Sequence, residues 1–194
     1  MLKVVIVDDE PLILMNLSEV LTEAGYEVVG TASNGFSAIE VCMEKKPDIL
    51  IADIRMPDLD GLQVAKYVHD GGFVETIVVV SAFDDDEFVV KAGNYGVSAF
   101  MVKPIDTKTL LSTIKVATIR SKELVELKNE IYRVNKNMES RKKIEKAKGL
   151  IMKKMQTDES SAFNYIREIS RNNNMSMNLV AEILLNGENS KEQS

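Results

Sequence analysis

Residues 1–105 alternate short apolar runs with amphipathic stretches. Three of the apolar runs (Val-Val-Ile-Val, Ile-Leu-Ile-Ala and Ile-Val-Val-Val) contain no charged residue, which is typical of strands buried on both faces of a parallel sheet. The pattern predicts strands at 3–7, 27–32, 49–52, 77–81 and 99–102, with helices between them at 11–24, 35–46, 61–70 and 87–95. This alternation indicates an α/β fold, in which right-handed crossovers build a doubly wound, five-stranded parallel sheet.

The pattern changes after residue 106. Between 106 and 155 there is no proline and a single glycine, Gly149, so this stretch favours helix. Five apolar residues follow the 3-4-3-4 spacing of a heptad seam: Leu124, Leu127, Ile131, Val134 and Met138. Because the flanking positions are heavily charged, we interpret the seam as a short coiled coil that pairs two chains. A single amphipathic helix packed on its own domain would give the same pattern.

Two shorter helices are predicted beyond the seam. Thr157-Asp158-Glu159 supplies a cap and an acidic first turn for one helix, and Ser176 caps the last helix. The predicted organisation is a first domain at 1–118, a coiled-coil linker helix at 119–140, a small three-helix domain at 141–188 and a disordered tail at 189–194.

The two parts of the chain differ in charge. The net charge is −6, yet residues 1–120 carry 10 basic and 19 acidic residues, whereas residues 121–194 carry 14 and 11. The segment 133–154 alone has 9 basic residues against Glu139 and Glu145. An acidic front half joined to a basic back half suggests two separate roles. By charge alone, the basic segment could equally be a solvated helix face.

Composition also bears on the compartment. No apolar run approaches the roughly 20 residues of a membrane-spanning helix, and residues 1–10 lack the apolar core of a signal peptide. Cys42 is the only cysteine, so no internal disulfide can form, which fits a reducing compartment. We therefore expect a cytoplasmic protein with no membrane partner, in which Cys42 is a small core side chain.

Polar residues stand at the ends of four predicted strands. Functional groups of an open α/β sheet gather at the carboxyl ends of its strands, which here carry Asp8-Asp9, Asp53, Ser81 and Lys103-Pro104. Clustered carboxylates repel one another unless a cation joins them, and Mg²⁺ accepts carboxylates, waters and a phosphate oxygen. With a lysine charge and a hydroxyl nearby, this set favours phosphoryl transfer onto Asp53 as the nucleophile.

Taken together, five motifs resemble the receiver domain of two-component response regulators. They are Val7-Asp8-Asp9-Glu10-Pro11, Asp53-Ile54-Arg55-Met56-Pro57, Asp60-Gly61, Ser81-Ala82 and Lys103-Pro104. The resemblance covers residues 1–118 and implies a flavodoxin-like sheet with strand order 2-1-3-4-5. It further implies that Asp53 accepts a phosphoryl group from a sensor histidine kinase. The implied Mg²⁺ ligands are Asp8, Asp9, Asp53 and the backbone carbonyl of Arg55.

The same resemblance assigns the remaining receiver residues. Ser81 and Lys103 would contact the phosphoryl group, and the Lys103–Pro104 peptide bond would be cis. Phe100 would be an aromatic switch residue coupled to the Ser81 hydroxyl, although a plain core role would suit it as well. The protein would then be a regulator and not an enzyme, apart from its own phosphoryl transfer and slow autodephosphorylation.

The basic part of the chain carries a second resemblance. The run 141–152 (Arg-Lys-Lys-Ile-Glu-Lys-Ala-Lys-Gly-Leu-Ile-Met), followed by 159–163, Ile166-Arg167 and Val180-Ala181, resembles the ANTAR module of transcription antiterminators. This implies a three-helix RNA-binding fold that holds paired RNA hairpins and prevents a terminator from forming. Lysine and arginine would bind phosphates, and unpaired loops would supply sequence specificity. The candidate RNA contacts are Arg141, Lys142, Lys146, Lys148, Lys153, Arg167 and Arg171.

The resulting hypothesis is a regulator that dimerises when Asp53 is phosphorylated and thereby aligns two output modules on two hairpins. The alternatives are a helical output domain that binds DNA or one that binds protein. The predicted last helix speaks against DNA recognition, since Asn178-Leu179-Val180-Ala181-Glu182-Ile183-Leu184 contains no basic residue.

Overall fold

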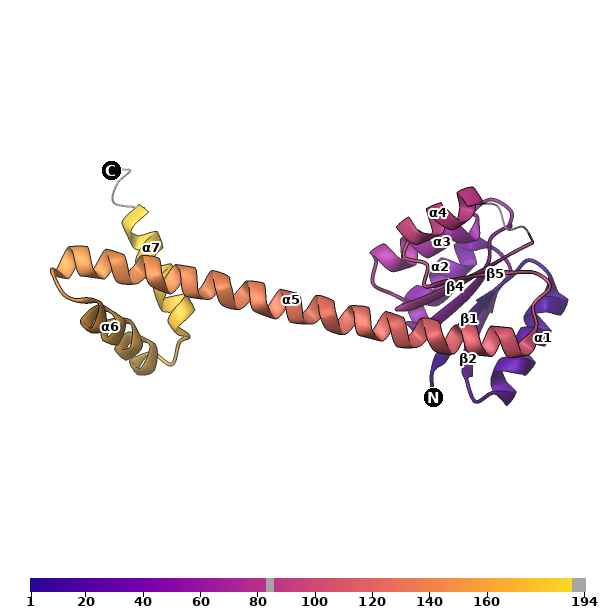
Figure 1. The fold of residues 1–194 in the computed structure, drawn as a ribbon, viewed down its shortest axis with the longest axis horizontal. Helices are drawn as coiled ribbons and strands as arrows, with labels where there is room; N and C mark the ends of the chain where they lie inside the picture. Colours follow the sequence, from indigo (N-terminus) through magenta and orange to yellow (C-terminus); the bar gives the residue numbers. More distant parts are fainter. Residues whose placement is uncertain (83–85, 190–194) are drawn as a thin grey trace. The chain divides into compact units, whose positions relative to one another are not determined.

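The computed structural model describes the backbone of residues 1–82 and 86–189, with side chains for 1–82 and 90–187. The chain divides into two compact units, Met1–Glu126 and Leu127–Ser194, each of which is considered by itself (Figure 1). The predicted disordered tail falls almost entirely on residues 190–194, which lie outside the described part of the chain.

The first unit is built on a five-stranded, wholly parallel sheet (Figure 1). Its strands are β1 (Lys3–Val7), β2 (Glu27–Ala32), β3 (Ile49–Asp53), β4 (Thr76–Ser81) and β5 (Ala99–Val102). The strand order β2-β1-β3-β4-β5 confirms the doubly wound α/β fold that the sequence predicts. The three central strands β1, β3 and β4 are buried almost throughout, which explains why their sequences read as apolar runs.

Helices cover both faces of this sheet. They are α1 (Pro11–Glu23), α2 (Gly35–Lys45), α3 (Gly61–Asp70), α4 (Asp86–Asn94) and the first part of α5 (Thr107–Met155). One core cluster joins the sheet to α2 and α3 and includes Cys42, which is fully buried as predicted. The other cluster joins the opposite face to α1 and α5 through Leu17, Leu21, Leu110 and Ile114.

The second unit is a three-helix module. It contains the C-terminal part of α5, α6 (Glu159–Asn172) and α7 (Met177–Asn189). Six buried residues form its core: Ala147, Ile151, Ala162, Ile166, Val180 and Ala181. Both predicted caps are present, since the Asp158 carboxylate accepts from Ser161 N at 2.7 Å and Ser176 Oγ accepts from Leu179 N at 3.2 Å.

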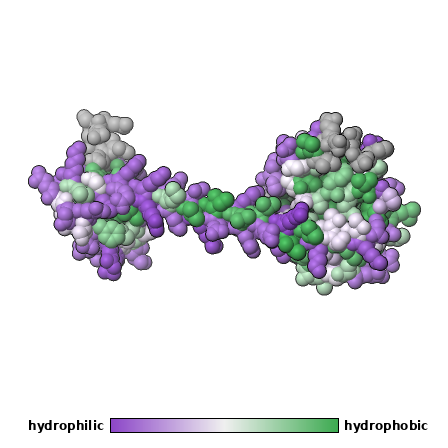
Figure 2. All heavy atoms as spheres, in the orientation of Figure 1, coloured by the Kyte–Doolittle hydropathy of each residue, from purple (hydrophilic) through white to green (hydrophobic). Residues whose placement is uncertain are grey.

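The helix α5 carries the predicted heptad seam. The five seam residues are between 51% and 60% exposed, so more than half of each of these apolar side chains lies open to solvent. Figure 2 shows hydrophobic residues along the solvent-exposed stretch of this helix. None of the five residues belongs to a core cluster of the described residues, which favours the coiled-coil interpretation for 124–138. Among the described residues, no helix is both long enough and apolar enough to cross a membrane.

The small core of the second unit gives a direct test of its packing. Ile166 is fully buried, whereas Ile183 in the same module is 53% exposed. We expect Ile166→Ala to destabilise the module by about 2–5 kcal/mol, because the truncation leaves a cavity, and Ile183→Ala to cost much less. Hydrogen exchange of α6 peptides in the full chain measures this difference. Equal exchange rates in the two variants would contradict the observed packing.

Candidate functional site

The four predicted polar strand ends meet at one edge of the sheet. Asp8 directly follows β1, Asp53 ends β3, Ser81 ends β4 and Lys103 directly follows β5. The register pairs Asp53 with Val80 and Ser81 with Val102, so these ends lie level across the sheet. Parallel pairing is what brings side chains so distant in sequence to the same edge.

The ammonium group of Lys103 joins two of the carboxylates. Lys103 Nζ lies 2.9 Å from Asp53 Oδ1 and 3.0 Å from Asp8 Oδ2, with Glu10 Oε1 farther away at 3.9 Å. Asp8 and Asp53 are only 3% and 5% exposed, so their charges are largely removed from water. Buried charges need paired partners, and a single lysine serves both carboxylates here. The Lys103–Pro104 peptide bond is cis.

The backbone fixes the second oxygen of Asp53. Arg55 N donates to Asp53 Oδ2 at 2.9 Å, which leaves Oδ1 with Lys103. The N-terminus of α3 abuts the same place, because a Cβ atom at Gly61 would overlap the carbonyl oxygen of Asp53. Asp60 and Gln63 form a capping box that starts α3 at this point. Lys103 and Arg55 N therefore each hold one carboxylate oxygen of Asp53, while Gly61 lets α3 begin against the Asp53 backbone.

Burial and pairing act in opposite directions on these groups. Burial raises the pKa of Asp53 above its ordinary value, and the hydrogen bond and charge of Lys103 reduce that rise. For Lys103, burial alone would lower the pKa, but hydrogen bonds to Asp53 and Asp8 outweigh it and raise the pKa. The lysine therefore stays protonated at neutral pH, between carboxylates that need its charge.

The predicted Mg²⁺ ligands are only partly assembled in this arrangement. Asp8 and Asp53 share one cation, but Asp9 is exposed, and no three acidic, histidine or cysteine side chains of the described residues converge on one point. The donor chemistry nevertheless fits a hard cation, since one positive group already lies within 3.0 Å of both buried carboxylates. The Arg55 backbone lies at the same sheet edge, two residues beyond Asp53.

The two candidate switch residues lie on neighbouring strands. Ser81 on β4 is 2% exposed, and Phe100 on β5 pairs in register with Val79, two residues before Ser81. Phe100 is partly buried and packs against the core cluster on the α2 and α3 face. Its position suits both interpretations offered by the sequence, a switch or a core side chain.

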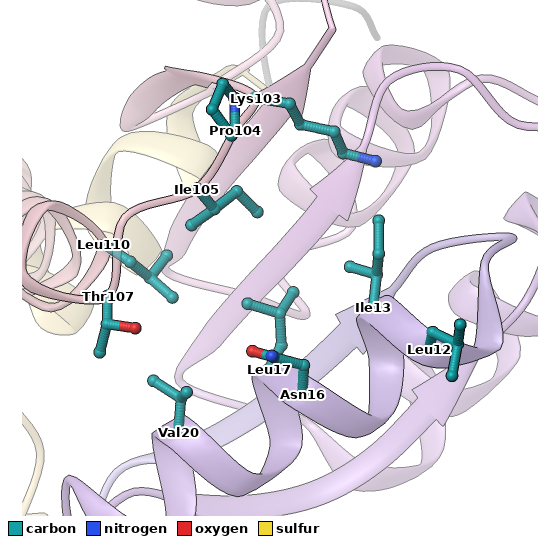
Figure 3. Close-up of a pocket in the computed structure, with 10 residues that line it drawn as sticks. All are labelled: Leu12, Ile13, Asn16, Leu17, Val20, Lys103, Pro104, Ile105, Thr107 and Leu110. Carbon is teal, nitrogen blue, oxygen red and sulfur yellow. The ribbon is translucent and has the colours of Figure 1, made fainter.

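A groove that the sequence did not predict lies beside Lys103. It has a volume of about 380 Å³ and runs between α1 and the segment that leads from β5 into α5. Figure 3 shows the apolar side chains of α1 facing Ile105 and Leu110 across it, with Lys103 and Pro104 at one end. The groove cannot be predicted from the sequence alone, because segments about ninety residues apart form its two walls.

Most of the predicted RNA contacts lie exposed on the second unit. Arg141, Lys142, Lys146 and Lys153 on α5 and Arg167 and Arg171 on α6 all face solvent. Spacings of four and seven residues place Lys142, Lys146 and Lys153 on one face of their helix. These side chains form a basic surface that a polyanion can reach.

Lys148 is the exception, and its assignment as an RNA contact needs correction. Its side chain is only 9% exposed, and its Nζ lies 2.6 Å from Glu159 Oε1 and 2.8 Å from Glu145 Oε1. Hydrogen bonds to these two carboxylates raise the pKa of Lys148. Lys148 connects α5 to the start of α6 and is already neutralised, so it is a structural residue of the module.

Comparison with protein families agrees with this division into two units. Residues 4–115 match the response regulator receiver domain, and residues 133–185 match the ANTAR domain. The chain therefore belongs to the two-component response regulators, with a receiver domain followed by an ANTAR output domain.

Individual relatives support the same assignment. The chain is 37% identical over 183 residues to the transcriptional regulatory protein PdtaR of Mycobacterium tuberculosis, covering 94% of this chain and 89% of that protein. It is 37% identical over 112 residues to the chemotaxis protein CheY of Thermotoga maritima, covering 58% of this chain and 93% of CheY. Among solved structures, the receiver domain of the putative response regulator NarL from M. tuberculosis aligns with a TM-score of 0.56 and 30% identity. That alignment covers 62% of this chain and 96% of the NarL domain.

The pairing at the sheet edge predicts a specific pKa change. Removing the ammonium group in Lys103→Met leaves the burial of Asp53 in place, so the pKa of Asp53 should rise further. A raised pKa means that ionised Asp53 disfavours folding. The stability that protonated Asp53 contributes is fully present below the ordinary pKa of aspartate. It is lost as pH rises through the raised pKa that Asp53 has in the folded chain. Carboxyl-carbon NMR titration measures the shift, with the exposed Lys115→Met as control; an unchanged or lower pKa in Lys103→Met would refute the pairing.

Proposed function

We propose that Asp53 accepts a phosphoryl group from a sensor histidine kinase and that this controls RNA binding by the ANTAR module. The observation that carries the proposal is the ammonium group of Lys103, shared by Asp53 and Asp8 at the sheet edge. It marks a place where negative charge is already concentrated and neutralised by a protein group. A phosphoryl group adds oxygens that need the same neutralisation.

The residues at this edge suit the transfer step. One oxygen of Asp53 attacks the phosphorus as the bond to the donor histidine nitrogen breaks, while Arg55 N holds the other oxygen. Lys103 and the Ser81 hydroxyl contact the phosphoryl oxygens. Mg²⁺, held by Asp8, Asp9, Asp53 and the Arg55 carbonyl, supplies further positive charge when bound. The chain is in this view a phosphoacceptor that also loses its phosphate slowly by itself.

The output step is RNA binding. The exposed basic residues of α5 and α6 provide phosphate contacts, and the match to the ANTAR domain supports RNA as the polyanion. The module binds paired hairpins and so favours transcription through a terminator. A DNA-binding output is less well supported, because α7 has no basic residue to serve as a recognition helix.

Dimerisation links the two steps. Phosphorylation adds about −1.5 to −2 charges at Asp53, which biases the receiver surface formed by α4, β5 and α5. That surface exposes apolar side chains, including Val102, Val116 and Ile119. The seam at 124–138 then pairs with its copy, which places two output modules side by side on two hairpins.

The phosphoacceptor can be tested through oligomeric state. With Mg²⁺ and acetyl phosphate, we expect the wild-type chain to shift toward dimer, because phosphorylation biases the receiver surface toward the state that pairs. Asp53→Ala should keep the oligomeric state that it had before treatment. The control Asp70→Ala should shift toward dimer as the wild type does. Size-exclusion chromatography with light scattering measures the shift. Dimerisation of Asp53→Ala that depends on the phosphodonor would count against this switch.

The seam can be tested separately from phosphorylation. Ile131→Asp places a charge on an exposed seam position, so this variant should gain phosphate normally, by intact mass, yet fail to dimerise. Asn129→Asp introduces the same charge at an outward heptad position and should dimerise. If Ile131→Asp still forms full dimer after phosphorylation, the seam is not the pairing surface.

The basic surface predicts a salt dependence. Removing one side chain that binds a phosphate should reduce the slope of log affinity against log salt by about 0.7–0.9. We expect this reduction for Arg141→Ala and for Lys142→Ala with a labelled paired-hairpin RNA, but not for Lys108→Ala in the receiver. A parallel titration with duplex DNA discriminates the alternative output. Unchanged slopes, or tighter binding to DNA, would overturn the assignment of this surface to RNA.

A further inference from the structure

A pair of serine hydroxyls ties α5 to the sheet of the receiver. Ser121 Oγ on α5 lies 2.9 Å from Ser98 Oγ, and Ser98 directly precedes β5. Ser121 is only 6% exposed, so this hydrogen bond is largely shielded from water. Shielded hydrogen bonds are costly to lose, because a buried hydroxyl without a partner has given up its contacts with water. The pair is therefore a firm connection between two elements.

Ser98 is itself held by β4. Its backbone N donates to Ile77 O at 2.7 Å, and its hydroxyl oxygen accepts from Ile77 N at 3.2 Å. Ile77 is fully buried and is the second residue of β4, whose last residue, Ser81, lies at the candidate phosphorylation site. With two hydrogen bonds to a buried strand, Ser98 moves with β4.

Ser121 is the last buried residue of α5 before the seam. The seam begins three residues later at Leu124, and no residue of α5 beyond Ser121 is buried until Ala147. The helix is continuous from Thr107 to Met155, so no break separates Ser121 from Leu124. The position of Ser121 therefore sets the direction in which the first seam side chain points.

A neighbouring hydroxyl illustrates a purely local role. Thr118 is 7% exposed, and its Oγ1 donates to Ile114 O at 2.8 Å within the same helix. Serine and threonine in helices commonly bond back to their own helix in this way. Ser121 differs from Thr118 because its hydroxyl is paired with a hydroxyl on another element.

We propose that Ser98 and Ser121 form a joint that makes β4 and α5 move together when Asp53 is phosphorylated. The inference rests on the proposed phosphorylation-dependent dimerisation and names the residues that connect the sheet to the seam. A displacement of β4 reaches Ile77 along the strand, Ser121 through the joint and Leu124 through one turn of helix. Without the joint, Asp53 still accepts the phosphoryl group, but the seam is no longer held in the orientation that pairs.

The test measures phosphorylation and dimerisation separately, on the full chain with Mg²⁺ and acetyl phosphate present throughout. Intact mass gives the phosphorylated fraction, and light scattering over a concentration series gives the dimer dissociation constant. We expect Ser121→Ala to be phosphorylated as the wild type is. Its dissociation constant should rise about fivefold, because one hydrogen bond that orients the seam is lost. Alanine favours helix, so α5 itself stays intact in this variant.

The matched control is Thr118→Val, which removes a buried hydroxyl from the same helix and keeps the shape of the side chain. This variant should dimerise with the dissociation constant of the wild type, even where its melting temperature falls. A loss of receiver stability would affect both variants, whereas loss of the joint affects Ser121→Ala alone.

A double-mutant cycle shows whether the two hydroxyls act as one unit. Ser98→Ala should raise the dissociation constant at least as much as Ser121→Ala does, because it also removes the acceptor of Ile77 N. The double variant should match Ser98→Ala, since the joint is already lost in the single variant. A role in stability alone would lower the melting temperatures and leave the dissociation constants of the phosphorylated chains unchanged.

Two kinds of negative result have different meanings. The joint would be overturned, with the proposed function left standing, by an unchanged dissociation constant in phosphorylated Ser121→Ala or by full additivity of the two serine substitutions. Dimerisation of Ser121→Ala without the phosphodonor, or its failure to gain phosphate, would also overturn the joint. If the wild-type chain gains phosphate and stays monomeric, or gains none, the proposed function fails together with the joint.

Discussion

The shared ion pair of Lys103 with Asp53 and Asp8 is the interaction on which the proposed chemistry depends. Two carboxylates that are almost completely buried would repel each other if no cation lay between them, and their pKa values would rise. The lysine supplies that cation from the loop after β5, while β1 and β3 supply the acids. In the proposed function, a phosphoryl group on Asp53 would change this balance of charge, which would let a local reaction bias the receiver surface.

Much of this site follows from the sequence, for a physical reason. Strands buried on both faces of a parallel sheet must be apolar, so the polar residue that ends each run marks the sheet edge unambiguously. The position of Asp53 as the last residue of β3 and of Lys103 just beyond β5 could therefore be predicted. The groove between α1 and the β5–α5 segment could not be predicted, since its shape depends on how distant side chains pack (Figure 3).

In the output module, the sequence predicts the helices and their caps but not the environment of every side chain. Its three helices and two caps follow from residues such as Asp158 and Ser176. Lys148 stands in a basic run, which groups it with the RNA contacts, but it follows Ile144 by four residues and precedes Ile151 by three. That spacing puts it on the buried face of α5, where Glu145 and Glu159 neutralise it. By contrast, the sequence does not predict that the buried side-chain oxygen of Asn178 lacks a hydrogen-bond partner among the described residues.

The most direct test of the central claim locates the phosphoryl group chemically. An acyl phosphate on an aspartate is reduced by borohydride to homoserine, which is read by sequencing the peptide that contains β3 in a mass spectrometer. After treatment with Mg²⁺ and acetyl phosphate, the account predicts homoserine at position 53 and at no other aspartate. Homoserine at Asp8 or Asp9 in place of position 53, or its absence from the whole chain, would contradict the account.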